Sequence, residues 1–319
     1  MIFMEIPITQ SQEWQKLQDE LGEKSFMEQG GDFHFLAILK NTPVGKYLYL
    51  PYGPIYVEKN GFKHALSRLE DLAKQEKAIF VRVEPRDQDF TNYQPKNTKK
   101  STDLNPKETW LLDLKGSEEE LKGKLPSRLL RYYKGAAKKG ITITTSHNPE
   151  DIHHLLDLQK ALADKKGIST FSEDYLKTEL KQPFATLYLV HYQPTEEDNL
   201  ADRAEQIVAA GLVFDHDKTR YNLQGAQSDL GRKLHATGIL TIQLILDAKA
   251  KGLNTFDFWG IAPEGAPDTH PWAGFTNFKK TFAGYEMDYA GTHDIVIDSK
   301  KYRLYQLSRK VNRFIRRNK

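Results

Sequence analysis

The sequence reads KYLYLPYGP over residues 46–54 and IFVRVEP over 79–85, and it reads TRYNLQGAQ over 219–227 and FDFWGIAPE over 256–264. Each pair begins with an aromatic-containing strand pattern and a glycine turn, continues through a helical segment, and ends with a second strand pattern close to Pro and Glu. Tyr47 lies 32 positions before Ile79, and Tyr221 lies 35 positions before Phe256. Two copies of one α/β module are therefore predicted.

The composition fits two folded domains. The chain has 319 residues, of which 39% are hydrophobic and 11% aromatic, and this is enough apolar material for two cores of ordinary size. There is no cysteine, which excludes disulfide frameworks, cysteine nucleophiles and thiolate metal sites. No secretory signal opens the sequence and no run of about 18 apolar residues occurs in it, so we expect a cytoplasmic protein.

Around the two modules the sequence predicts mixed α and β elements. Helices are expected over 11–21, 61–76, 118–139 and 231–251, and strands over 33–39, 47–50, 79–83, 110–114, 186–190, 207–214, 220–223 and 255–258. Residues 86–108 are expected to form a polar loop. We assign the chain to the α/β (α+β) class, with a first domain of residues 1–115 and 292–319 and a second of residues 116–291.

The charge is concentrated in the C-terminal tail. Of the 46 basic residues, nine stand between positions 300 and 319, where there is no acidic residue. The remaining 37 face 43 acidic residues, so residues 1–299 carry a net charge of −6 although the whole chain carries +3. Such a tail is suited to a phosphate-rich partner, either a nucleic acid or an anionic membrane surface.

Two helical segments combine an apolar stripe with a basic face. The segment 118–139, which we expect to break at Pro126, has Leu121, Leu125, Leu129, Tyr132 and Ala136 at helical spacing. Arg128 and Arg131 lie on a second face, which is either an ordinary solvated surface or a contact for phosphates. The tail repeats the design, with Leu304, Leu307, Val311 and Phe314 expected to pack on the protein and Arg309, Arg313, Arg316 and Arg317 around them.

The familiar sequence signatures of phosphate loops and metal sites are absent. The sequence contains neither GxGxxG nor GxxxxGK[ST], and no glycine has Gln or Arg three positions before it, as a CoA-binding loop would require. It contains neither HExxH nor GxSxG. The neighbouring histidines His153 and His154 would not share a helix face. We therefore expect no metal site and no bound cofactor.

The most distinctive stretch is 256–282, in which a strand leads through a Gly/Pro-rich loop into a short aromatic helix bearing Lys279. One interpretation makes Phe278 and Phe282 core residues and Lys279 their exposed neighbour. The alternative is that the fixed charge of Lys279 stabilises a developing oxyanion. The residues alone leave both open.

This stretch resembles the C-terminal signature of the Fem family of peptidoglycan-bridge aminoacyltransferases. The resemblance rests on DFWGIAP (257–263) with HPWAGFTNFKKTFAG (270–284), and on SQEW (11–14), YLYLPYGPIYV (47–57), VRVEP (81–85) and SRLLRYYKGAAKKGI (127–141) in the family's order. It implies two tandem GNAT-like domains with mixed sheets flanked by helices. No heptad stretch for a coiled-coil arm is present, so the compact, FemX-like form is implied, in which the C-terminal segment returns to the first domain.

The resemblance also implies a reaction and its partners. An amino acid (Gly, Ala or Ser) would pass from aminoacyl-tRNA, the co-substrate, to the stem-peptide amine of a peptidoglycan precursor, either lipid II or UDP-MurNAc-pentapeptide. Lys279, following Phe278, would stabilise the oxyanion. The family's substrate-binding positions match Glu84, Ser169 and Tyr175, with Trp14 in the SQEW motif. A family tyrosine falls on Leu223, with Tyr221 two residues earlier and expected on the same face.

Two basic positions that hold the precursor's diphosphate in the family are occupied here by Gln18 and Phe171. Their loss removes charge-assisted phosphate contacts and leaves lipid-linked and UDP-linked precursors both open, with Lys16 or Lys46 as replacement cations. The basic tail then has two rival uses, at the acceptor stem of tRNA or at the inner membrane leaflet. The alternatives to the transferase are a GNAT-fold enzyme with another acyl donor and a protein that only binds tRNA or precursor.

Overall fold

Each copy of the repeated module folds as a strand, a helix and a second strand that pairs parallel to the first. In the first copy these are β3 (Gly45–Leu50), α2 (Lys59–Gln75) and β5 (Ala78–Val83), and in the second they are β11 (Thr219–Gln227), α8 (Ala236–Ala250) and β12 (Thr255–Gly260). A helix fits this place because parallel strands need a long crossover connection. The duplication predicted from the sequence is thus present.

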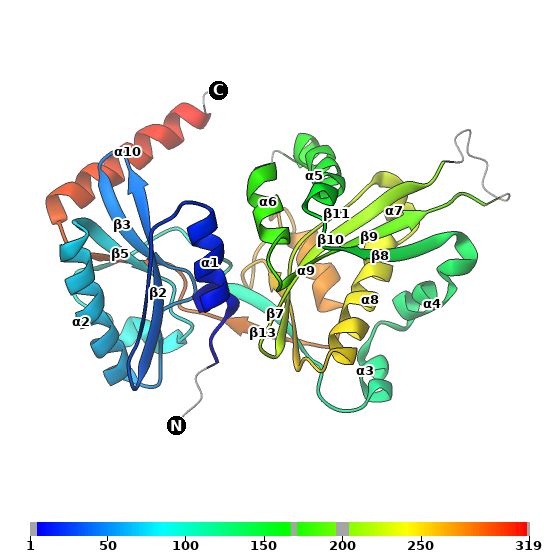
Figure 1. Cartoon of the computed structure of the whole chain (residues 1–319), viewed down its shortest axis with the longest axis horizontal. Helices are drawn as coiled ribbons and strands as arrows, with labels where there is room; N and C mark the ends of the chain where they lie inside the picture. The colour runs from blue at the N-terminus through cyan, green and yellow to red at the C-terminus, as the bar shows by residue number, and fades with distance from the viewer. Residues whose placement is uncertain (1–4, 167–170, 196–203, 318–319) are drawn as a thin grey trace. The chain divides into compact units, whose positions relative to one another are not determined.

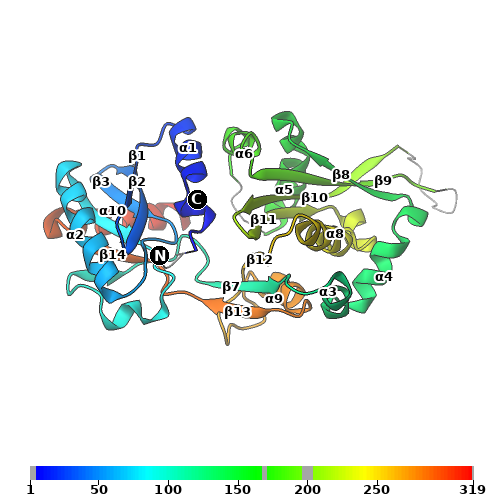
Figure 2. The same ribbon diagram turned by 60° about the horizontal axis from the view of Figure 1, so that its bottom comes forward.

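The computed structural model describes residues 5–166, 171–195 and 204–317. The chain divides into unit 1, residues 1–107 and 288–319, and unit 2, residues 108–287. Each unit contains one mixed seven-stranded sheet with helices against it (Figures 1 and 2). The predicted α/β (α+β) class, with two units that each hold a mixed sheet flanked by helices, is confirmed.

Unit 1 is built on a sheet of strand order β1-β2-β3-β5-β14-β6, with β4 paired to β2. Its remaining elements are η1 (Ile8–Gln10), α1 (Gln12–Glu20), β1 (Ser25–Gln29), β2 (Phe33–Thr42), β4 (Ile55–Tyr56), η2 (Gln88–Asn92), β6 (Thr98–Lys100), β14 (His293–Val296) and α10 (Ser299–Arg317). Helix α1 begins at Ser11, whose side chain accepts a hydrogen bond from the Trp14 amide.

The alternation along β5 divides the core of unit 1 between two faces. Val81 and Val83 belong to the cluster that α2 covers, whereas Phe80 belongs to a second cluster with Tyr302 and Tyr305 of α10. From Phe80 to Val83 this follows from the period of two along a strand, which sends neighbouring side chains to opposite faces. Ile79, before them, also belongs to the second cluster. The sequence IFVRV therefore supplies both sides of the sheet from one strand.

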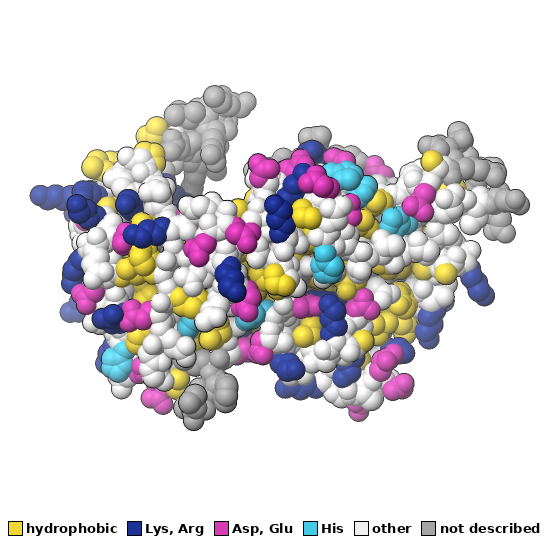
Figure 3. Space-filling view, in the orientation of Figure 1, with side chains coloured by type: hydrophobic (Ala, Val, Ile, Leu, Met, Phe, Trp, Pro, Cys, Tyr) yellow, Lys and Arg dark blue, Asp and Glu magenta, His cyan; other side chains and the backbone are white. Residues whose placement is uncertain are grey.

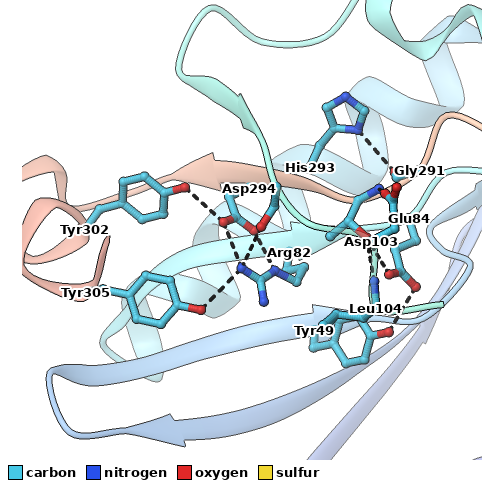
Figure 4. Close-up of polar contacts among 12 residues, drawn as sticks. Tyr49, Arg82, Glu84, Asp103, Leu104, Gly291, His293, Asp294, Tyr302 and Tyr305 are labelled. Atoms are coloured by element: carbon cyan, nitrogen blue, oxygen red, sulfur yellow. Dashed lines mark hydrogen bonds and ion pairs between the residues drawn. The ribbon is translucent and has the colours of Figure 1, made fainter. Parts of the chain in front are cut away.

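Arg82, the next residue of β5 on the α10 side, forms a buried ion pair with Asp294 of β14 (Figure 4). Its Nε donates to Oδ1 at 2.7 Å and its Nη2 to Oδ2 at 2.9 Å. Tyr302 donates to the same carboxylate at 2.9 Å, and Nη2 also donates to the Tyr305 hydroxyl at 3.3 Å. One pair of charges thereby joins β5, β14 and α10.

Unit 2 is built on a sheet of strand order β13-β7-β12-β11-β10-β9-β8. Its remaining elements are β7 (Glu108–Asp113), α3 (Glu118–Lys124), α4 (Ser127–Gly135), η3 (Ala137–Lys139), β8 (Ile141–Ser146), η4 (Pro149–Asp151), α5 (Ile152–Lys166), α6 (Glu173–Leu180), β9 (Ala185–Tyr192), β10 (Gln206–His216), α7 (Asp229–Lys233), α9 (Ala273–Lys280) and β13 (Tyr285–Asp288). A capping box at Ser117 opens α3, and Pro126 separates α3 from α4, as predicted.

The domain boundaries differ from the prediction because two strands are exchanged between the sheets. Residues 108–113, expected in the first domain, form β7, which pairs antiparallel with β12 of unit 2. The equivalent place beside β5 of unit 1 is taken by β14, which comes after all of unit 2 in the chain. The boundaries therefore fall at 107/108 and 287/288 rather than at 115/116 and 291/292.

Three local expectations are wrong. Residues 86–108 contain η2 and β6 in addition to loop, because β14 arrives from the far end of the chain to pair with β6. The helix expected over 231–251 is broken at His235, which has a positive φ of 58°. Three members of the tail stripe do not pack: Leu304, Leu307 and Val311 are exposed, and α10 is held by its tyrosines instead. The side chain of Phe314 lies outside the described part of the structure.

We expect Asp294→Asn to destabilise unit 1 by about 3–5 kcal/mol, because it leaves the buried Arg82 guanidinium without its counter-charge. The exposed pair Lys74–Asp71 provides a control, and Asp71→Asn should cost less than about 1 kcal/mol. Denaturant unfolding would measure both, with hydrogen exchange of β5 and β14 reporting on unit 1 by itself. Equal losses in the two variants would contradict the role given to the ion pair.

Candidate functional site

The candidate site lies in unit 2, where the parallel strands β11 and β12 part. They pair over only three positions, of which the last joins Tyr221 to Asp257. Beyond that pair β11 continues along β10 as far as Gln227, while β12 continues to Gly260. Residues at the point of separation are thus presented from two strands that no longer pair with each other.

A β-bulge decides which side chains of β11 share a face. Tyr221 pairs with Phe214 and Gln224 pairs with Leu212 of β10, so Leu223 is the extra residue at the bulge. Because Phe214 and Leu212 are two positions apart on a regular strand, Tyr221 and Gln224 point to the same face. Leu223 itself has no paired residue on β10, so the expectation that it shares the face of Tyr221 stays a prediction.

Asp257 organises the end of β12. Its carboxylate accepts hydrogen bonds from the Thr109 hydroxyl of β7 and from the Trp259 amide, the latter at 2.7 Å. Trp259 has a positive φ of 65°, a conformation that costs energy for a residue with a bulky side chain. Its ring lies edge-on to Tyr221 at 6.3 Å. The carboxylate of Asp257 thus holds a strained turn next to the last strand pair.

Lys279, the predicted catalytic residue, stands near the C-terminal end of α9. Its Nζ donates a hydrogen bond of 2.6 Å to the carbonyl of Gly260, directly after Trp259. Burial lowers the pKa of Lys279 to about 8, although the negative charge of Asp257 acts in the opposite direction. Lys279 is therefore a largely buried amine at the end of β12, within electrostatic range of Asp257.

Two contacts of α9 hold Lys279 in place. Phe278, predicted as its catalytic neighbour, packs partly buried against the core of unit 2, with its ring edge-on to Phe282 at 5.5 Å. The Thr276 hydroxyl accepts a hydrogen bond of 2.8 Å from the Ala262 amide and so ties the loop after β12 to α9. Phe278 is thus a packing residue, as the first interpretation expects, but Lys279 is not its exposed neighbour. The oxyanion role of Lys279 stays a prediction.

Glu179 is a residue that the sequence reasoning missed. It is only 2% exposed, and its carboxylate accepts hydrogen bonds from Tyr175, one helical turn earlier on α6, and from Gln224 at 3.4 Å. Gln159 of α5 donates in turn to Gln224 at 3.0 Å. Burial raises the pKa of Glu179 to about 8. The signal available beforehand was the spacing of four between Tyr175 and Glu179, which places both on one face of a helix.

The sheet face of unit 2 therefore connects two titratable groups. At one end of this face, Gln224 contacts Glu179 and points to the same side of the sheet as Tyr221. At the other end, Tyr221 is paired with Asp257, and the charge of Asp257 acts on Lys279. Paired residues of neighbouring strands point to the same side of a sheet. An ammonium group that can stabilise an oxyanion and a carboxylate that can accept a proton are the usual components of an acyl-transfer site.

Of the other predicted substrate residues, Tyr175 lies in this cluster and Glu84 and Trp14 lie in unit 1. Glu84 is buried, and its carboxylate accepts a hydrogen bond from Tyr49 at 2.9 Å (Figure 4). It also accepts from the Asn105 side chain at 2.8 Å and from Thr292 at 2.7 Å. Trp14 is a buried residue of α1. Ser169 lies outside the described residues. A substrate that binds Glu84 would have to displace one of these three partners.

The two positions that lack the family's basic residues differ in environment. Gln18 is buried on α1, whereas Phe171 is exposed and its ring stacks on Tyr175 at 5.0 Å. An exposed aromatic ring therefore stands beside the Tyr175–Glu179 cluster, at the position where the resemblance implies a cation.

The predicted basic contacts fall into two groups. Arg128 and Arg131 are exposed on α4, and both guanidinium groups lie over the ring of Tyr132, at 5.5 and 5.8 Å from its centre. Arg309 is half-buried on α10 over Tyr305. The side chains of Arg313, Arg316 and Arg317 lie outside the described part of the structure. Their binding roles stay predictions.

In the part of the chain that the structure describes, no group of three or more acidic or histidine side chains is arranged to hold a metal ion. Within the same residues, none of the helices has the length and apolar character needed to cross a membrane.

Residues 177–310 match the sequence model of the FemAB family. The resemblance to the Fem family is confirmed. The FemAB segment includes Glu179, Tyr221 and Lys279 and ends within α10. No match was found among curated proteins.

Among solved structures, the chain is similar to FemX, with 17% sequence identity over 93% of this chain and 94% of that chain and a TM-score of 0.78. It is also similar to L-PGS from Bacillus licheniformis, with 16% identity over 98% of this chain and 99% of that one and a TM-score of 0.58. At these identities the likeness is one of fold.

Glu179→Gln should change how stability depends on pH. Between about pH 4.5 and 8 the folded wild type holds a proton on Glu179 that the unfolded chain releases, so its stability falls as the pH rises through this range. Glutamine does not titrate, so the free energy of unfolding of the variant should rise relative to that of the wild type from about pH 5 to 8. Glu173→Gln, at an exposed position on the same helix, is the control. Denaturant unfolding measures the difference, and a gap that stays constant with pH would refute the buried, protonated Glu179.

Proposed function

We propose that this protein transfers an amino acid from aminoacyl-tRNA to the stem-peptide amine of a peptidoglycan precursor, and that it needs no bound cofactor. The observation that carries the proposal is the position of Lys279, partly buried and held by its neighbours at the end of β12 in a segment of FemAB type. A fixed ammonium group of this kind stabilises the charge that develops when an ester carbonyl is attacked.

In the proposed step the acceptor amine attacks the ester carbonyl of the aminoacyl group. A C–N bond forms and the ester C–O bond breaks, the negative charge passes through the carbonyl oxygen, and the ribose hydroxyl of tRNA leaves with a proton. One N–H of Lys279 is used on the Gly260 carbonyl. Because a lysine ammonium has three donors, two remain for the oxyanion.

The amine must lose a proton before or during the attack. We assign the proton transfer to Glu179, which is linked to this sheet face through Gln224 and whose raised pKa makes it an effective base near pH 8. Tyr175 and Gln224 orient its carboxylate through their hydrogen bonds. Tyr221, between Glu179 and Asp257 on this face, would contact the acceptor.

The precursor is proposed to be lipid-linked rather than UDP-linked. The positions that would grip a soluble diphosphate are the buried Gln18 and the exposed aromatic Phe171, neither of which provides a charge-assisted phosphate contact. The transferred amino acid is Gly, Ala or Ser, and the assay below separates them.

Purified protein should transfer label from tRNA charged with Gly, Ala or Ser to lipid-linked pentapeptide. Lys279→Met should lower the rate by about 10²–10³-fold, the usual cost of removing an oxyanion partner, and should leave precursor binding nearly unchanged. UDP-linked pentapeptide and acetyl-CoA serve as the competing acceptor and donor. Normal turnover by Lys279→Met would show that Lys279 does not stabilise the oxyanion. If the folded protein transferred no label with any combination of tRNA and precursor, the remaining candidates would be an enzyme with another acyl donor and a protein that only binds tRNA or precursor.

The transfer rate should have a bell-shaped pH profile with its maximum near pH 8. It should rise as Glu179 loses its proton and fall as Lys279 loses its own, because the first acts as a base and the second as a cation, and both have a pKa of about 8. Lys279→Arg keeps its charge and should remove the alkaline limb, whereas Glu179→Gln should remove the acid limb. A profile that neither variant alters would contradict both assignments.

A further inference from the structure

The C-terminal helix α10 exposes three apolar side chains that the sequence pattern predicts to pack on the protein. The exposed fractions of Leu304, Leu307 and Val311 are 55%, 57% and 56%. Spacings of three and four residues place these side chains on one face of a helix. Figure 3 shows hydrophobic side chains on the surface over α10.

The opposite face of α10 already fastens the helix to unit 1. Tyr302 and Tyr305 are buried beside Phe80 and Val296, and both hydroxyls bind the Arg82–Asp294 pair. The stripe is therefore not needed to hold α10 on the protein. Three large apolar side chains that are exposed side by side on one helix face form a patch. Such a patch indicates an interaction surface, whereas apolar residues exposed singly do not.

The charges beside the stripe select the kind of partner. Lys300, Arg303 and Lys310 are exposed on the same helix, and residues 299–319 contain nine basic side chains and no acidic one. An apolar stripe bordered by cations is the arrangement of helices that lie in the surface of an anionic bilayer. A tRNA would use the cations through its phosphates but would leave the leucines in water.

We propose that α10 lies in the surface of an anionic lipid membrane, with Leu304, Leu307 and Val311 inserted at the boundary of headgroups and acyl chains and the basic residues on lipid phosphates. The inference rests on the proposed function for its purpose, since it would bring the enzyme to a lipid-linked acceptor. The binding itself is measured without any transfer, so either can fail without the other.

The test is flotation of the full chain with vesicles of phosphatidylglycerol and phosphatidylethanolamine, compared with vesicles of phosphatidylcholine. The wild type should bind the anionic vesicles and be released by salt. The triple variant Leu304→Gln, Leu307→Gln, Val311→Gln should bind them at least about tenfold more weakly. Leu104→Gln, which removes an exposed leucine elsewhere in unit 1, should bind like the wild type. The affinity for anionic vesicles should fall about fivefold in each of three single variants, Lys300→Gln, Arg303→Gln and Lys310→Gln.

A filter-binding assay with tRNA is the second arm. The triple glutamine variant should bind tRNA like the wild type, and this also shows that it remains folded. Two results would overturn the proposal. One is anionic-vesicle binding that is absent in the wild type or unchanged in the triple variant. The other is a loss of tRNA binding in the triple variant with vesicle binding intact, which would assign the stripe to RNA.

Discussion

The buried ion pair between Arg82 and Asp294 is the interaction on which unit 1 depends. Its partners are 212 positions apart, and all of unit 2 is inserted between them. Because β14 brings Asp294 to β5, the sheet of unit 1 is complete only when the end of the chain has returned. The same carboxylate accepts from Tyr302, so the pair fixes α10 as well. A buried charge without its partner is destabilising. The N-terminal and C-terminal segments of unit 1 must therefore pack together for the unit to be stable.

Unit 2 has the same plan, with a different use of its exchanged strand. β7 lies beside β12 as β14 lies beside β5, and its Thr109 binds Asp257 at the last pair of β11 and β12. Asp257 holds Trp259 in its left-handed turn, after which the Gly260 carbonyl meets Lys279. β7, which precedes the other strands of unit 2 in the sequence, thus helps to shape the end of the sheet where the reaction is proposed.

Burial affects the two titratable groups of this face in opposite senses and brings both to the same pH. It lowers the pKa of Lys279 and raises that of Glu179, each to about 8, because an apolar surrounding disfavours the charged form of either group. An amine and a carboxylate that are poised together near neutrality suit a reaction in which one proton is removed and one negative charge is stabilised.

The sequence by itself determined the two modules, the break at Pro126, the capping box at Ser117 and the signature around Lys279. These depend on local periodicity, turn residues and motif spacing, which the chain carries within short windows. Only the tertiary structure decided the exchange of β7 and β14, the bulge at Leu223, the burial of Glu179 and the outward direction of Leu304, Leu307 and Val311. Strand pairing and the choice of a helix's buried face depend on partners far along the chain. An amphipathic pattern shows that a face is apolar, and only the packed neighbours decide whether that face is covered.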